Sequence, residues 1–124
     1  MPKTREHRKQ AEHNAAAQAY LDQEPSFADW SVTVLFYRAL QHVDAYLAAK
    51  AGLKDIGSHA ERESAILNHC ARILTPYKSL DSRSREARYS CVPFSEQDVR
   101  DFEQRYLNRI KKDLEELSPG ITAP

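Results

Sequence analysis

One segment constrains the fold more than any other, the stretch from about Phe27 to Ala51, where apolar side chains recur at steps of three and four residues. That spacing places them on one face of an α-helix. The stripe comprises Val32, Leu35, Phe36, Ala39, Leu40, Val43, Tyr46 and Leu47. Because Trp30, Val34 and Tyr37 widen the apolar surface onto a second face, we expect this helix to be the central one.

The composition also favours helices over sheets. The 124 residues include only three glycines and few β-branched residues, whereas alanine, leucine, glutamate and arginine are abundant. A chain of this length forms one domain with its own core. We therefore predict an all-α, up-and-down bundle of four or five helices in a single domain, residues 1–124, with 1–4 and 119–124 as flexible termini.

Start and stop residues divide the rest of the chain into four further helices. The first runs from about Arg5 to Gln23, and a stripe of small side chains is expected to pack closely on a partner helix. Its members are Ala11, Ala15, Ala16 and Ala19. Gly52 and Gly57 bracket a loop, and "SHAE" then forms a capping box that opens the third helix at Ser58.

The fourth helix is predicted from about Pro76 to Tyr89, since proline suits a first helical turn. "SCVPF" forms a loop, and "SEQD" caps the last helix at Ser95. That helix carries the cleanest amphipathic stripe and ends at "SPG". The stripe consists of Val99, Phe102, Tyr106, Ile110, Leu114 and Leu117.

Charge, cysteine content and hydropathy restrict the function classes. The net charge is zero, so no global field marks a nucleic-acid-binding protein, although residues 76–92 carry a local excess of +2. Cys70 and Cys91 form no disulfide framework, and neither a secretory leader nor a membrane span is expected. We predict a cytoplasmic protein with reduced thiols and no contact with a membrane.

Four of the five histidines are predicted to be structural or solvated. His7 and His13 lie on a polar terminal helix, and His42 is expected to be partly buried with its hydrogen bonds satisfied. His69 adjoins Cys70, but no second Cys/His pair follows. No metal site and no cofactor are therefore predicted.

His59 and Arg62 form the first candidate site. His59 follows the N-cap Ser58 at the positive end of a helix dipole, and Arg62 lies one turn later on the same face. Together they can form a corner that binds phosphate. The alternative is that His59 packs at the start of the helix while Arg62 pairs with Glu61, Glu63 or another acid.

The stretch "SRSREARY", residues 82–89, is the second candidate site. Arg85 and Tyr89 share a helix face and Arg88 lies beside it, whereas Arg83 points elsewhere. A guanidinium group binds two phosphate oxygens at once and keeps its charge, so a phosphate-binding role fits. Solvation or pairing with acids is the alternative. The residues predicted to bind phosphate or RNA are Lys78, Arg83, Arg85 and Arg88.

The segments "DWSVTVLFYRALQHVDAYLA", "SHAERESAI" and "YKSLDSRSREARY", followed by an amphipathic helix, resemble the HEPN superfamily in a small stand-alone form. The resemblance covers roughly residues 29–117. It implies a helical bundle, commonly a homodimer, and RNA cleavage without metal in toxin–antitoxin or antiviral defence systems. A nucleotidyltransferase antitoxin is the partner that some members have.

Family members carry an arginine, four to six residues of spacer and then a histidine. Here the positions allowed after Arg83 hold Arg88 and Tyr89, and those after Arg85 hold no histidine either. Two hypotheses follow. In one, the catalytic residues are rearranged to His59, Arg62, Arg85 and Tyr89, with His59 as the base. In the other, catalysis is lost and the domain binds RNA, a nucleotide or a partner protein.

Overall fold

The computed structural model describes residues 4–53 and 56–122, and within these ranges every regular element is helical. The main helices are α1 (Thr4–Leu21), α2 (Ala28–Ala51), α3 (His59–His69), α4 (Leu74–Tyr89), α5 (Glu96–Phe102) and α6 (Asn108–Leu117). Three short elements join them, namely η1 (Pro25–Phe27), η2 (Ala71–Ile73) and η3 (Glu103–Leu107). The prediction of an all-α bundle is confirmed.

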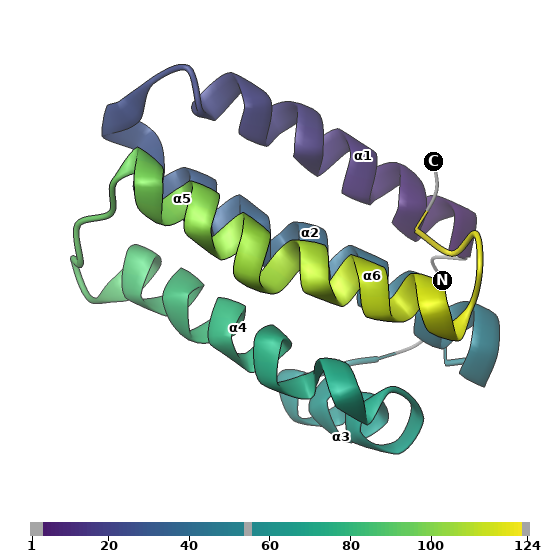
Figure 1. Cartoon of the computed structure of the whole chain (residues 1–124). Coiled ribbons are helices and arrows are strands. Elements are labelled where there is room, and N and C mark those ends of the chain that lie inside the picture. The colour runs from purple at the N-terminus through teal and green to yellow at the C-terminus, as the bar shows by residue number, and fades with distance from the viewer. Residues whose placement is uncertain (1–3, 54–55, 123–124) are drawn as a thin grey trace.

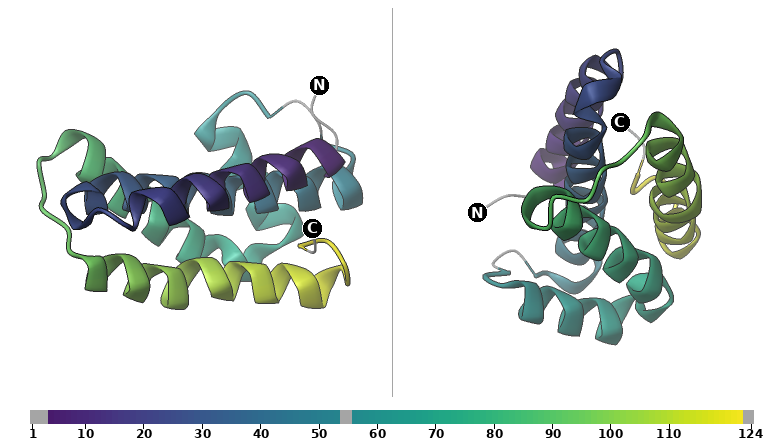
Figure 2. Two further views of the ribbon diagram at one scale, coloured as in Figure 1. Left: turned by 90° about the horizontal axis from the view of Figure 1, so that it is seen from above. Right: turned by 90° about the vertical axis from the view of Figure 1, so that its left-hand side faces the viewer.

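The helices pack around α2. Figure 1 shows α1 along one edge, α4 along the other, and α5, η3 and α6 as one continuous rod crossing in front of α2. In the right-hand view of Figure 2, α3 lies on the side of the bundle away from α1. The predicted stripe of α2 is buried throughout, and Val32, Leu35, Phe36, Val43 and Leu47 have no measurable exposure. The single core thus forms where the sequence places it.

Local sequence explains where the helices begin and end. Glu24 is extended because Pro25 follows it, and Gly52 closes α2 in the left-handed conformation, at a φ of 68°. The Ser58 hydroxyl accepts a hydrogen bond from the Glu61 amide, as predicted, but the Glu61 carboxylate reaches back to the amide of Gly57. The second half of that capping arrangement therefore lies one residue earlier than expected.

The last rod begins as predicted and then departs from a regular helix. Ser95 and Asp98 form a reciprocal capping box. From Glu103 to Leu107 the backbone widens into a π-helical turn, which rotates the residues beyond it. Leu107, absent from the predicted stripe, is consequently buried, whereas Leu117 is partly exposed.

The predicted alanine stripe of α1 is only partly correct. Ala11 is buried, but Ala16 and Ala19 are exposed. The buried face instead contains His7 and Gln18, because α2 offers both of them hydrogen-bond partners. The His7 imidazole lies 2.7 Å from the Gln41 amide oxygen, so the prediction that His7 is solvated is wrong.

The terminal segments differ from the expected flexible ends. Thr4 already belongs to α1, and its hydroxyl donates to the carbonyl oxygen of Ala45. After α6 the chain turns back (Figure 1), Ile121 enters the core, and Thr122 donates two hydrogen bonds to Glu115. Residues 1–3 and 123–124 of those predicted termini, and residues 54–55 of the predicted loop after Gly52, lie outside the described ranges.

Candidate functional site

A cation–aromatic cluster of Tyr37, Arg88 and Tyr89 lies where α4 ends beside α2. Arg88 donates to the Tyr37 hydroxyl over 2.9 Å, and its guanidinium carbon lies 5.6 Å from the Tyr37 ring centre and 5.0 Å from that of Tyr89. Ser84 anchors the same guanidinium through its carbonyl oxygen, at 3.2 Å, and its hydroxyl. The side chain of Arg88 is thus held in place by neutral groups, and its charge is not neutralised by them.

Exposed aromatic side chains extend from this cluster along α2. Tyr89 is 74% exposed and Trp30 is 53% exposed. Helices α2 and α4 run antiparallel (Figure 1). Trp30 lies seven residues before Tyr37 on the same face of α2, so it lies toward the end of α4 that carries Arg88. The second apolar face that the sequence predicts for α2 therefore opens to solvent.

Arg85 lies beside the cluster but is paired with an acid. Its Nε donates to Asp81 over 3.1 Å; the Arg85 side chain is 55% exposed and that of Asp81 only 10%. The hydrogen bond and charge of Asp81 raise the pKa of Arg85, and Glu63 of α3 acts in the same direction. One edge of the guanidinium therefore serves Asp81 while the rest of the side chain faces solvent.

Arg62 is structural in this fold. It is buried and donates two hydrogen bonds to Asp44 of α2, over 2.8 Å and 3.1 Å. Burial would lower the pKa of Arg62, but the hydrogen bond and charge of Asp44 raise it overall. The predicted alternative, pairing with an acid, is therefore what the structure contains, although the acid is neither Glu61 nor Glu63.

Tyr77 lies next to that ion pair in the interior. Its hydroxyl is buried without a hydrogen bond of good geometry among the described residues. Burial raises the pKa of this phenol, and the nearby Arg62 charge opposes the increase. Tyr77 thus completes a buried polar junction between α2, α3 and α4.

His59 is exposed at the start of α3. Its ring centre lies 6.3 Å from that of Phe36, and Phe36 in turn contacts Tyr37, the partner of Arg88. Within the described part of the chain, no hydrogen bond or ion pair joins His59 to Arg85, Arg88 or Tyr89. The two predicted sites therefore share one side of α2, but aromatic rings stand between His59 and Arg88.

The other two predicted RNA-binding residues lie apart from Arg88. Arg83 pairs with Glu86 over 3.1 Å on its own helix. Lys78 is exposed and makes no ion pair or hydrogen bond within residues 4–53 and 56–122. Since Lys78 is seven residues before Arg85, it extends the Arg85 face toward the start of α4.

Sequence inspection missed Tyr37 as a partner of Arg88 and Asp44 as the partner of Arg62. An indication was available for Asp44, which is an acid flanked by buried positions in the most apolar helix. Such a carboxylate requires a cationic partner. Nothing in the sequence indicates which cation that is.

His42 also differs from expectation. It is buried, but its Nδ1 has no hydrogen-bond partner among the described residues, so the prediction of a satisfied histidine is wrong. Burial, together with the charges of Lys111, Arg38 and Arg8, lowers its pKa to about 4.

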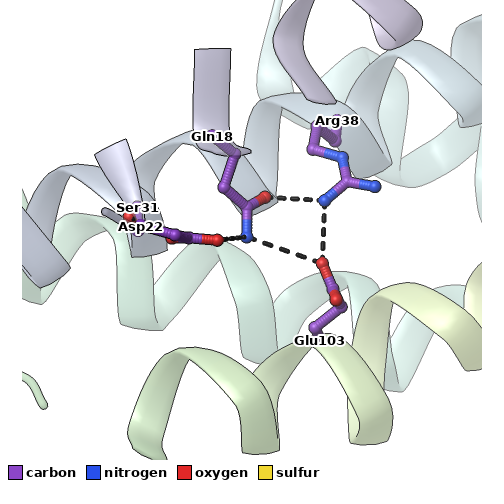
Figure 3. A network of polar contacts seen from close by, with 5 residues as sticks. All are labelled: Gln18, Asp22, Ser31, Arg38 and Glu103. Atoms are coloured by element: carbon purple, nitrogen blue, oxygen red, sulfur yellow. Dashed lines mark hydrogen bonds and ion pairs between the residues drawn. The ribbon is translucent and has the colours of Figure 1, made fainter. Parts of the chain in front are cut away.

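A further polar network ties α1, α2 and η3 together (Figure 3). Arg38 donates to Glu103 over 2.8 Å and to Gln18 over 2.6 Å. Asp22 accepts from Ser31 over 2.7 Å, and the amide of Gln18 faces both Asp22 and Glu103. This network fixes the π-helical turn against the first two helices.

Among residues 4–53 and 56–122, no three His, Cys, Asp or Glu side chains gather closely enough to hold a metal ion. None of the described helices combines the length and apolar character needed to cross a bilayer.

No family model, curated protein or solved structure matches the chain.

Proposed function

We propose that this chain is an RNA-binding domain of the HEPN type, and that the cation–aromatic cluster is its contact with single-stranded RNA. The observation that carries the proposal is the arrangement of Arg88 against two tyrosine rings, with neither of its neighbours neutralising its charge. Trp30 and the exposed side of Arg85 extend the same surface.

The chemistry of the cluster matches unpaired RNA. The guanidinium group of arginine can donate two hydrogen bonds to one phosphate. Exposed aromatic rings stack on unpaired bases, and each stacked base contributes about 1–3 kcal/mol to binding. The local charge excess of residues 76–92 attracts the backbone although the whole chain is neutral. Because base stacking and phosphate contacts do not distinguish bases strongly, we expect the affinity for single-stranded RNA to vary little with RNA sequence and to fall strongly as the salt concentration rises.

Binding of single-stranded RNA can be tested by fluorescence anisotropy. A labelled RNA of mixed sequence should bind the wild-type protein at about 50 mM salt and weaken markedly at about 200 mM. Arg88→Ala should weaken binding by about tenfold or more, and Tyr89→Ala by somewhat less. Arg109→Ala is the control for the loss of one arginine charge, because Arg109 lies on α6 and pairs there with Asp113.

Two results would refute the RNA-binding proposal. One is the absence of any anisotropy change at low salt. The other is an equal loss of affinity in Arg88→Ala and Arg109→Ala, which would indicate general attraction to a charged polymer.

RNA cleavage without metal is the second candidate function, favoured by the exposed ring of His59 on the same side of α2. His59 would accept the proton of the 2′-hydroxyl, the 2′-oxygen would form a bond to phosphorus, and the bond to the 5′-oxygen would break as that oxygen takes a proton from water. Arg85 or Arg88 would hold the phosphate. Cleavage of total RNA in EDTA, abolished by His59→Ala, would support it. Intact RNA after prolonged incubation would restrict the domain to binding.

The resemblance also suggests a homodimer acting in toxin–antitoxin or defence systems. In the adapter alternative, the same surface binds a nucleotide or a partner protein such as a nucleotidyltransferase. Co-purification of such a partner, lost in Arg88→Ala and without affinity for RNA, would favour the adapter.

A further inference from the structure

A cavity of about 140 Å³ lies between α1, α2 and α6, apart from the cation–aromatic cluster. Helical spacing brings its walls together, because Arg38 and His42 lie four residues apart on α2. On α1, the small side chains of Ala11 and Ala15 leave the space open. The cavity is lined by Arg8, Ala11, Glu12, Ala15, Arg38, His42, Lys111 and Thr122.

Two residues that line this cavity each have a buried polar atom without a partner among the described residues. His42 Nδ1 and Arg38 Nε make no hydrogen bond within the described part of the chain. Most buried polar atoms in proteins are hydrogen-bonded, so two exceptions on adjacent turns of one helix indicate a shared role. His42 is only 7% exposed, and rearrangement at the surface cannot easily satisfy it.

Three cationic side chains lie around His42. Lys111 of α6, Arg38 of α2 and Arg8 of α1 all disfavour its protonation, in addition to the effect of burial. Lys111 makes no ion pair or hydrogen bond among the described residues, so its charge remains available.

Three acidic side chains also lie near these cations. Glu12 lines the cavity, and Glu103 accepts from the Nη1 of Arg38 and leaves its Nε free. Glu115 accepts hydrogen bonds from the backbone of Gly120 and Thr122, and these, with a smaller effect of Arg8, lower its pKa. Glu103 and Glu115 are thus already engaged by hydrogen bonds, whereas Lys111 has no such partner among the described residues and can pair with an anion.

We propose that this cavity binds a tetrahedral oxyanion, the phosphate group of a small ligand, with His42, Arg38 and Lys111 as donors. The cavity is several times larger than the roughly 10–15 Å³ that one water needs. Charge-assisted hydrogen bonds from arginine and lysine are the usual means of holding phosphate. A bound anion would also favour the protonated form of His42, so binding takes up a proton.

Titration calorimetry at low ionic strength tests this site with inorganic phosphate as the probe. Wild-type protein should bind it with a dissociation constant of about 1 mM or tighter. Lys111→Ala should weaken binding at least about fivefold. Lys112→Ala is the matched control, since it removes the same charge from the adjacent exposed position and should change affinity by less than about twofold.

Comparison with adenosine monophosphate then identifies the source of the phosphate. Equal or tighter binding of the nucleotide, still sensitive to Lys111→Ala, assigns the site to an esterified phosphate. Binding of inorganic phosphate alone assigns it to the free ion. Absence of binding by both probes, or an equal loss in the Lys111 and Lys112 variants, would overturn the proposal.

Sulfate, which remains a dianion from neutral to mildly acidic pH, tests the coupling to His42. Its affinity should rise as pH falls, by up to about tenfold per unit, and the dependence should flatten in His42→Gln. An unchanged pH profile in that variant would refute a role for His42. In wild-type protein, the His42 ring resonances should shift when sulfate binds.

The cavity and the RNA surface can be separated experimentally. Arg88→Ala should retain phosphate binding, and Lys111→Ala should retain RNA binding. If each variant loses both ligands to the same extent, the effect is one of overall charge, and a distinct oxyanion site does not exist.

Discussion

The buried junction of α2, α3 and α4 and the surface at the end of α4 both contain an arginine next to a tyrosine, but they use it differently. Inside, the Nε and one terminal nitrogen of Arg62 both donate to Asp44, and Tyr77 lies beside the pair. Outside, Arg88 contacts two hydroxyls, a carbonyl oxygen and two rings. A carboxylate partner neutralises the charge of Arg62 inside the fold, whereas the neutral partners of Arg88 leave its charge able to interact with a ligand.

The largest effect is expected from Asp44→Ala, which leaves Arg62 buried without a counter-charge. It should lower the free energy of unfolding by about 3–5 kcal/mol, as measured by urea denaturation. The double variant Asp44→Leu/Arg62→Met should recover much of that loss, because both charges are removed together. A single-variant loss below about 1 kcal/mol would show that the pair is solvated and that the contrast with Arg88 does not hold.

The next largest effect concerns pH and His42. Its pKa is about 4 in the folded state against an ordinary value of 6.5, so the unfolded chain binds the proton more readily. Stability should be unaffected above about pH 7 and fall by about 2 kcal/mol by pH 5 in chloride buffer, approaching about 3 kcal/mol below pH 4.

His42→Gln provides the control for that pH dependence. Urea denaturation of the variant should show a smaller change in stability between pH 7 and pH 5 than the wild type. Identical changes in the two proteins would assign the dependence to other groups. In that case the buried His42 would contribute no more to the pH dependence of stability than an exposed histidine does.

A smaller effect on stability is expected from Arg88→Ala. Its contacts are with neutral groups near the surface, and removing them should change the free energy of unfolding by about 1 kcal/mol or less. Urea denaturation beside the RNA titration separates the two consequences. A large loss of stability would mean that Arg88 is structural, like Arg62, and would weaken the proposed role in binding.

The smallest effect is expected from Arg85→Ala, since the Arg85 side chain is exposed and its pair with Asp81 lies within one helix. The thermal midpoint should stay within experimental error. A marked decrease would instead show that Asp81, whose side chain is largely buried, depends on Arg85 for its counter-charge.

The fold was predictable from the sequence to the extent that it depends on local patterns. The stripe from Val32 to Leu47 and the caps at Ser58 and Ser95 identify helices because spacing and capping act within a few residues. The π-helical turn was not predictable, since its extra residue is stabilised by contacts of Glu103 with Arg38 and Gln18, which lie far away in the sequence.

The candidate site was predictable only in part. Arg88 and Tyr89 stand out because they are adjacent in an arginine-rich helix. The interior position of Arg62 depends on Asp44, eighteen residues away, and the lack of a partner at His42 depends on how three helices meet. Contacts between side chains on different helices leave no periodic pattern in a single sequence. An arginine could therefore be assigned either to a buried ion pair or to a binding surface.

The exposure of Trp30 has an optical consequence, because it is the one tryptophan in the chain. Its indole is already in contact with water in the native protein. The wavelength of its maximum fluorescence should therefore be long in the folded state and change little on unfolding. Stacking of a nucleobase on the ring would instead quench the fluorescence. If RNA binds as proposed, the fluorescence of Trp30 would report that binding without an added label, and it would change little on unfolding.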